Sequence, residues 1–243
     1  MRSRSFFAVA AGVALLDIAI LGVYPWHRYR NDALLVSTEP AAILAKPNLL
    51  ANAINQGRPL YRQHCAHCHG IALQGDTVRG VPNLAANAWL YGNDPVEVEH
   101  TILYGIRSGH PKARNVADMP PLVRIGQITA EQARDAAEFL ESLAGEPHDE
   151  AMAQRGGQVY FGAGNCFDCH APDAHGASDY GAPPLTGPRW LYGGDRQTVY
   201  ESIRNGRHGI CPAWINKLTP LQIRALTLYL VSAPRTIQST VRP

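Results

Sequence analysis

The residues best suited to chemistry in this chain form two Cys-x-x-Cys-His motifs, at residues 65–69 and 166–170, which lie 101 residues apart. In such a motif the two cysteines form thioether bonds to the vinyl groups of a haem, and the adjacent histidine ligates the iron. One motif alone could be a chance zinc or redox pair, but two predict a pair of covalently attached haem c groups. The residues expected to hold them are Cys65, Cys68 and His69 in the first motif and Cys166, Cys169 and His170 in the second.

A second pair of blocks repeats at the same offset. Residues 89–92 and residues 190–193 both read Trp-Leu-Tyr-Gly. Self-similarity at one fixed spacing is the signature of an internal duplication, so each repeat is expected to form one haem domain. We expect Trp89 and Trp190 to pack at the haem edges. The pattern predicts a dihaem cytochrome c that carries electrons, and no catalytic residue is expected.

A low-spin haem needs a second axial ligand, and Met119 is the candidate in the first repeat. It precedes two prolines in a turn-rich segment, and the only other methionines are Met1 and Met152. A thioether sulfur is a soft, neutral ligand that favours ferrous iron and raises the reduction potential. We therefore expect Met119 to ligate the haem of the first motif.

The corresponding loop of the second repeat has Cys211 where a methionine is expected, when the repeats are aligned before their last helices. Three interpretations stay open for the second haem. Cys211 ligates the iron as a thiolate, His208 ligates instead, or the iron is five-coordinate and Cys211 is a small buried residue. A thiolate would stabilise ferric iron and lower the potential of this haem relative to the other.

The length of 243 residues accommodates two domains of about 100 residues each and a short additional segment. A hydrophobic content of 46% with 17% charged residues indicates a globular chain, and a net charge of +2 without a basic run gives no reason to expect nucleic acid as a partner. The expected divisions are a membrane anchor (1–30), a tether (31–48), a first cytochrome c domain (49–145), a linker (146–154), a second cytochrome c domain (155–235) and a C-terminal tail (236–243).

Residues 6–24 form a mainly apolar stretch behind a basic start, long enough to cross a membrane as one helix. A cleaved signal peptide is the alternative. The aromatic and basic residues 24–30 favour an uncleaved anchor instead. Asp17 lies within this stretch, where a carboxylate usually faces a protein partner or water. Because c-type haems are attached on the periplasmic side in bacteria, we expect a single-pass protein of the inner membrane with its haem domains in the periplasm.

Helix signals dominate the rest of the chain, so a mainly α fold with two tandem class I-like cytochrome c domains is expected. A helix is predicted over Leu49 to Gln63. Each repeat should also end in a helix with a capping box, which begins at Thr129 with Gln132 or at Thr219 with Gln222. Gly57 and Tyr61 lie four residues apart on one helix face, as do Gly156 and Tyr160, and a small residue beside an aromatic lets another helix approach closely.

The chain resembles subunit III of the cbb3-type cytochrome c oxidases, the membrane-anchored dihaem cytochrome of that complex. The likeness rests on the two haem motifs, on the Trp-Leu-Tyr-Gly blocks at 89–92 and 190–193, and on Asn-Gly-Arg-His-Gly at 205–209. The resemblance implies that electrons pass from a periplasmic donor cytochrome c through both haems toward the oxygen-reducing catalytic subunit. It also implies the catalytic and monohaem subunits of the oxidase as partners. Cys211 departs from the pattern, because the family has methionine before this Pro-Ala-Trp sequence.

Two other functions are compatible with the same residues. The first is a dihaem dehydrogenase of a small sulfur compound, which would use a cysteine-ligated haem with Arg189 or Arg207 facing the substrate. The second is a free membrane-anchored dihaem cytochrome that serves another reductase.

Overall fold

The computed structural model describes residues 26–86, 89–187 and 190–240, and almost all of their regular structure is helical. Apart from isolated β-bridges, no strand occurs in these ranges, which confirms the predicted mainly α fold. The predicted membrane segment 6–24, with Asp17, lies outside the described residues. Within the described part of the chain, no helix is both long and apolar enough to cross a membrane. Residues 26–37 are helical, and the helices that follow are α2 (Pro40–Ile43), α3 (Pro47–His64), α4 (Ala66–His69), α5 (Pro95–Tyr104), α6 (Ala130–Ala144), α7 (Glu150–Phe161), α8 (Phe167–His170), α9 (Arg196–Asn205) and α10 (Pro220–Thr240).

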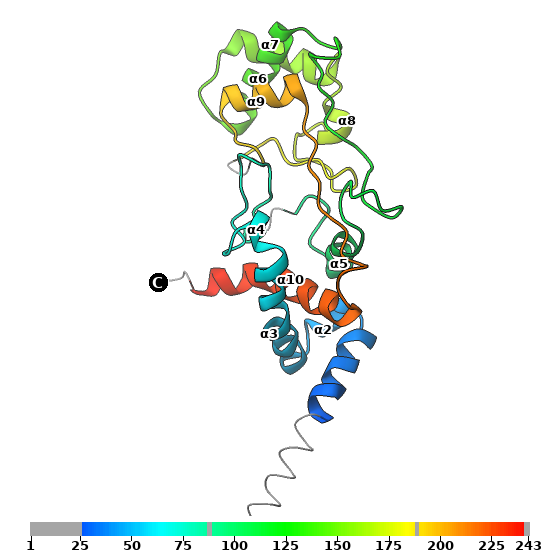
Figure 1. Ribbon diagram of the computed structural model, residues 1–243. Coiled ribbons are helices and arrows are strands. Elements are labelled where there is room, and N and C mark those ends of the chain that lie inside the picture. The colour runs from blue at the N-terminus through cyan, green and yellow to red at the C-terminus, as the bar shows by residue number, and fades with distance from the viewer. Residues whose placement is uncertain (1–25, 87–88, 188–189, 241–243) are drawn as a thin grey trace, which may run out of the picture.

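The helices form two lobes, and each lobe contains the last helix of the other repeat. In the first lobe, α10 packs on α3 and α5. In the second lobe, α6 packs on α7 and α9. Figure 1 shows α6, α7, α8 and α9 at one end of the molecule and α2, α3 and α10 at the other. The last helix of each repeat therefore packs on helices of the other repeat.

The connection between α6 and α7 explains this exchange. Only residues 145–149 separate the two helices, and such a short connection makes neighbouring helices pack antiparallel. Gly145 ends α6 in the left-handed conformation with a φ of 78°. Asp149 begins α7 by accepting a hydrogen bond from the Met152 amide. The predicted linker 146–154 is thus too long, because its second half belongs to α7.

Both predicted capping boxes are present. The Thr129 hydroxyl accepts from the Gln132 amide at 3.1 Å, and the Gln132 side chain accepts from the Thr129 amide at 2.8 Å. Thr219 and Gln222 form the same pair at 3.3 and 2.8 Å. These reciprocal bonds satisfy amides that have no partner inside the helix. The two helices that are exchanged between the lobes therefore begin where the sequence predicts.

The two glycine–tyrosine pairs are the contact points of the exchanged helices. A Cβ on Gly57 of α3 would lie 2.2 Å from the Ala225 carbonyl oxygen of α10. A Cβ on Gly156 of α7 would lie 1.9 Å from the Asp135 carbonyl oxygen of α6. Both contacts require a residue without a side chain. One turn further along, Tyr61 and Tyr160 are almost fully buried in the core of their lobes.

The predicted tether 31–48 is packed rather than extended. Leu35 and Ile43 are fully buried in a cluster with Leu228 of α10. The Arg224 side chain donates to the Leu35 carbonyl at 2.7 Å and to the Thr38 carbonyl, and it forms an ion pair with Glu99 of α5 at 2.7 Å. A cation at the carboxyl end of a helix also interacts favourably with the helix dipole. The first lobe is therefore fixed to helix 26–37.

Candidate haem sites

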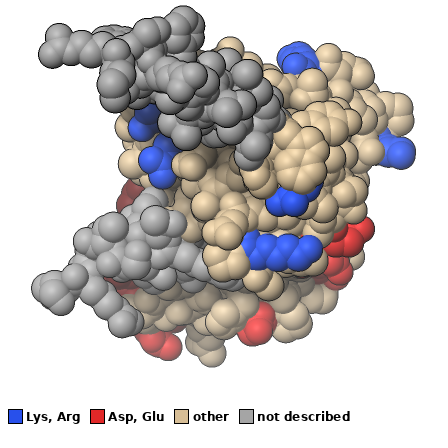
Figure 2. All heavy atoms as spheres, turned by 90° about the horizontal axis from the view of Figure 1, so that it is seen from below, with Lys and Arg blue, Asp and Glu red and all other residues tan. Residues whose placement is uncertain are grey.

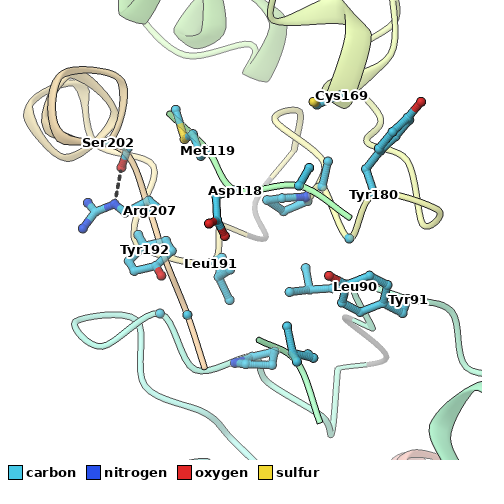
Figure 3. A pocket seen from close by; sticks show the side chains of 18 of the residues that line it. Leu90, Tyr91, Asp118, Met119, Cys169, Tyr180, Leu191, Tyr192, Ser202 and Arg207 are labelled. Carbon is cyan, nitrogen blue, oxygen red and sulfur yellow. Dashed lines mark hydrogen bonds between the residues drawn. The ribbon is translucent and has the colours of Figure 1, made fainter. Parts of the chain in front are cut away.

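One cavity connects the two haem motifs. Its volume is about 670 Å³, and both motif histidines and all five cysteines line it. The two repeated blocks contribute Leu90, Tyr91, Leu191 and Tyr192 to its middle, as Figure 3 shows. Trp89 and Trp190 also line it, and each packs against the core of its own lobe. The cavity thus extends from one haem motif to the other across the boundary of the lobes.

The motif histidines are held by equivalent proline carbonyls. The Nδ1 atom of His69 lies 3.3 Å from the Pro82 carbonyl oxygen, and that of His170 lies 2.9 Å from the Pro183 carbonyl oxygen. Because a carbonyl only accepts, Nδ1 carries the proton and Nε2 keeps its lone pair for a metal. Burial lowers the pKa of both histidines, which favours the neutral imidazole.

Burial favours the protonated thiol at Cys65, Cys166 and Cys169 as long as these cysteines are free. Desolvation raises the pKa of Cys65 to about 12 and that of Cys166 to about 11, and it also raises the pKa of Cys169. All five cysteines of the chain are free of disulfide bonds. Each motif therefore offers two separate thiols next to a neutral imidazole, which is the donor set that covalent haem attachment requires.

Met119 lies in the second lobe. It packs against the core that contains Leu122, Val159 and Tyr160, as do Cys166 and Trp190. The Met119 carbonyl accepts a hydrogen bond from the Arg207 amide at 3.0 Å, and the Leu122 amide donates to the Ile203 carbonyl at 3.1 Å. The segment that carries Met119 therefore runs along the second repeat, beside the motif of His170.

Cys211 lies in the first lobe. Its amide and carbonyl exchange two hydrogen bonds of 2.9 Å with Ile106, directly after α5. Burial is the main cause that raises the pKa of Cys211 to about 11, and the proximity of Cys68 adds to it. Further along, the Trp214 ring contacts His64 with ring centroids 5.0 Å apart. The segment that carries Cys211 thus runs beside the motif of His69.

The two sulfur-bearing segments therefore run beside the opposite motifs from those with which the sequence pairs them. The sequence places Met119 with the first motif and Cys211 with the second. In the structure, Met119 lies beside the second motif and Cys211 beside the first. The cause is the same exchange that moves the helices, because each loop leads into the exchanged helix that follows it. A glycine marks each crossing: a Cβ on Gly105 would lie 2.3 Å from the Cys211 carbonyl oxygen, and one on Gly206 would lie 2.4 Å from that of Met119.

His208, the alternative ligand in the sequence, is turned toward a carboxylate. Its Nδ1 atom lies 2.9 Å from an Asp118 oxygen, and its side chain is 56% exposed. It is not among the residues that line the cavity. The structure therefore gives His208 a partner at the surface, whereas Cys211 is among the residues of this loop that line the haem cavity.

The repeated tyrosines have a role that the sequence does not indicate, because each contacts the other repeat. A Cβ on Gly80 would lie 2.0 Å from the Tyr192 ring, and one on Gly181 would lie 2.2 Å from the Tyr91 ring. Arg207 lies over the Tyr192 ring at 4.1 Å and Arg114 over the Tyr91 ring at 4.7 Å. Gly80 and Gly181 also have the same backbone conformation, with a φ of 66° at both. The shared offset of 101 residues was the only sequence signal for this reciprocal contact.

These features fit two haems: one apolar cavity, two neutral imidazoles, paired thiols at both ends, and one sulfur-bearing loop for each motif. Comparison with protein families agrees. A family model described as cytochrome c matches residues 54–144. The chain is thus a dihaem c-type cytochrome with two covalently bound haems.

The second half identifies the family more closely. Residues 151–230 match the family model described as cytochrome c oxidase, cbb3-type, subunit III. The CcoP subunit of the cbb3-type oxidase from Cereibacter sphaeroides is 37% identical over 196 residues, which are 81% of this chain and 66% of that protein. The FixP subunit from Bradyrhizobium is 38% identical over 208 residues, 85% of this chain and 70% of that protein. The CcoP subunit from Rhodobacter capsulatus is 37% identical over 206 residues, 82% and 68% of the two chains. The chain spans about two thirds of the length of these relatives, and it belongs to the family of cbb3-type oxidase subunits CcoP and FixP.

Proposed function

We propose that this chain is the electron-transfer subunit of a cbb3-type cytochrome c oxidase and passes electrons through its two haems toward the oxygen-reducing subunit. The observation that carries the proposal is the continuous cavity, which both haem motifs line. Electron transfer between the haems needs them close together, and the residues of the two lobes surround both sites jointly. The bound iron supplies the redox chemistry. The protein sets its ligands, its exposure to water and its partners.

The ligand assignment follows from the crossed loops. We propose that Cys65 and Cys68 would attach the first haem and that His69 and Cys211 would ligate its iron. Cys166 and Cys169 would attach the second haem, and His170 and Met119 would ligate its iron. The Met119 thioether would then keep the second haem at the higher potential, and a Cys211 thiolate would lower the potential of the first.

The surface beside the second haem motif favours a cationic electron donor. Asp168, Asp173 and Asp179 are exposed in this loop, and the positions 101 residues earlier hold His67, Ala72 and Val78. Asp168 also lines the haem cavity. Figure 2, a view from the opposite end of the molecule, shows Lys and Arg side chains together with Asp and Glu side chains on that face. Opposite charges accelerate the encounter of two proteins. We therefore propose that a basic periplasmic cytochrome c delivers electrons at the second haem.

Membrane attachment is part of the proposal. It is supported by the apolar stretch 6–24 and by the firm packing of helix 26–37 against α10. A helix that crosses the bacterial inner membrane and continues into helix 26–37 would hold both lobes in the periplasm. The monohaem and catalytic subunits of the oxidase would be reached from this position.

The alternative of a sulfur-compound dehydrogenase lacks support from the cations that it requires. Arg207 lies on the Tyr192 ring and donates to the Ser202 hydroxyl at 2.9 Å, so its guanidinium is already engaged. Arg189 lies outside the described residues. We therefore propose the role of electron carrier and not that of a dehydrogenase.

Purification of the chain from its native membrane, in mild detergent, tests the function. We expect it to co-purify with high-spin haem and copper and to be oxidised by oxygen only in that complex. We also expect its reduction by a basic cytochrome c to slow steeply with added salt. Isolation as a lone dihaem protein, beside an oxidase that is fully active without it, would contradict the proposal.

A further inference from the structure

The two loops that carry the proposed ligands are joined by one side chain. Arg107 follows Ile106, the residue whose backbone pairs with Cys211. Its Nε atom donates to the Gly209 carbonyl at 2.6 Å, two residues before Cys211. Its Nη1 atom donates to the Ala117 carbonyl at 3.0 Å, two residues before Met119. One planar guanidinium thus bonds to the backbone of both segments, two residues before each sulfur residue.

A carboxylate completes this connection. Asp118 lies 3.2 Å from Arg107 Nη1 and is bonded through its other oxygen to His208. Arg107 and His208 occupy equivalent positions of the two repeats, at the offset of 101 residues. The duplication therefore brings both residues to one acidic side chain next to Met119. Figure 3 shows Asp118 and Met119 adjacent on the segment that crosses the cavity.

Arg107 is held in a conformation that serves this contact. Its side chain is only 14% exposed, and it lines the haem cavity. Its backbone has a φ of 48°, in the left-handed region that bulky residues rarely adopt. Such backbone strain persists only where the surroundings impose it, and it is concentrated at functional sites. The strained backbone of Arg107 directly follows Ile106, which pairs with Cys211, and it directs the Arg107 side chain to the segment that carries Met119.

We propose that Arg107 is a positioning residue that ties the Met119 and Cys211 loops together and keeps both sulfur ligands from being displaced. This inference rests on the proposed ligand assignment. Backbone hydrogen bonds hold Cys211 to Ile106 and Met119 to Arg207, and Arg107 adds the side-chain bonds that join the two loops to each other. A guanidinium suits this task because its rigid fork reaches several acceptors at once. The Arg107 side chain would thus stabilise the ligand loops of both haem sites at once.

Displacement of the ligands by imidazole tests the proposal in the purified ferric protein with both haems. Arg107→Gln removes charge-assisted hydrogen bonds, so we expect it to raise the apparent imidazole affinity of both haems by about tenfold. The readouts are the absorption spectrum and the loss of the methionine–iron charge-transfer band. Arg107→Lys keeps the charge without the fork, so we expect an intermediate increase. This variant also serves if the glutamine variant assembles poorly.

Arg224→Gln is the matched control. Arg224 is similarly buried, with 12% of its side chain exposed, and it donates to the Leu35 and Thr38 carbonyls rather than to the ligand loops. It does not line the haem cavity, so we expect less than a twofold change in this variant. Equal titrations for the Arg107 and Arg224 variants, with a normal methionine band at the second haem, would overturn the proposed role of Arg107 alone. Absence of that band from the unmodified second haem would instead refute the ligand assignment on which this role rests.

Discussion

At the scale of single residues, the two haem sites differ in one sulfur atom's chemistry. Met119 offers a neutral thioether, and Cys211 offers a thiol that ionises only when a metal stabilises the thiolate. Burial, with a smaller contribution from the nearby Cys68, raises the pKa of Cys211 to about 11, so the free thiol is protonated at neutral pH. Because the Cys211 segment runs beside the motif of His69, the proposed assignment gives the cysteine to the first haem and the methionine to the second.

Replacement of Cys211 by methionine should make the two haems alike. We expect Cys211→Met to raise the reduction potential of the first haem by on the order of 100 mV, because ligand identity shifts haem potentials over a range of about 0.8 V. The second haem should shift much less. A redox titration monitored by electron paramagnetic resonance separates the two. An unchanged first haem in Cys211→Met and in Cys211→Ser would show that Cys211 does not ligate.

The residue types of the sites could be predicted from the sequence, but their pairing could not. Cysteines, histidines and the duplicated tryptophans are recognisable because their spacing repeats. Pairing Met119 with a motif requires knowledge of the path of the chain. The sequence of a duplicated protein is the same whether the last helix of each repeat packs on its own repeat or on the other one. The proline carbonyls at Pro82 and Pro183 repeat as well, and they were a readable signal for the histidine partners.

At the scale of helices, the exchange depends on close backbone contacts at Gly57 and Gly156. Two predicted features of the sequence, the capping boxes and the glycine–tyrosine faces, were confirmed because they are local. The identity of the partner helix was not predictable from them, since α6 and α10 carry the same signals. The length of the 145–149 connection decides between the partners.

Gly156→Ala should disrupt the contact of α7 with α6. Its Cβ would lie 1.9 Å from a backbone oxygen, so we expect the free energy of unfolding to fall by about 1–3 kcal/mol. Gly157→Ala is the control on the same helix, because its Cβ would meet the Phe139 ring at 3.4 Å. The gain in helix propensity, up to about 1 kcal/mol, should offset that milder contact. Thermal unfolding followed by circular dichroism measures both variants, and equal stabilities would contradict the contact.

At the scale of the whole molecule, each lobe combines segments of both repeats. The first motif lies with α10 and the Cys211 loop, and the second lies with α6 and the Met119 loop. The tyrosine contacts and Arg107 add further contacts across the same boundary. Under the proposed assignment, this exchange would hold both haems along one cavity, which suits a protein that passes electrons between them.

Removal of one haem at a time tests the crossed arrangement most directly. Cys65→Ser with Cys68→Ser abolishes attachment at the first motif, and Cys166→Ser with Cys169→Ser abolishes it at the second. The measurement is the methionine–iron charge-transfer band of the remaining ferric haem. We expect the band to persist when the first motif is removed and to vanish when the second is removed. The reverse result, with the band tied to the first motif, would contradict the crossed pairing of ligands and motifs.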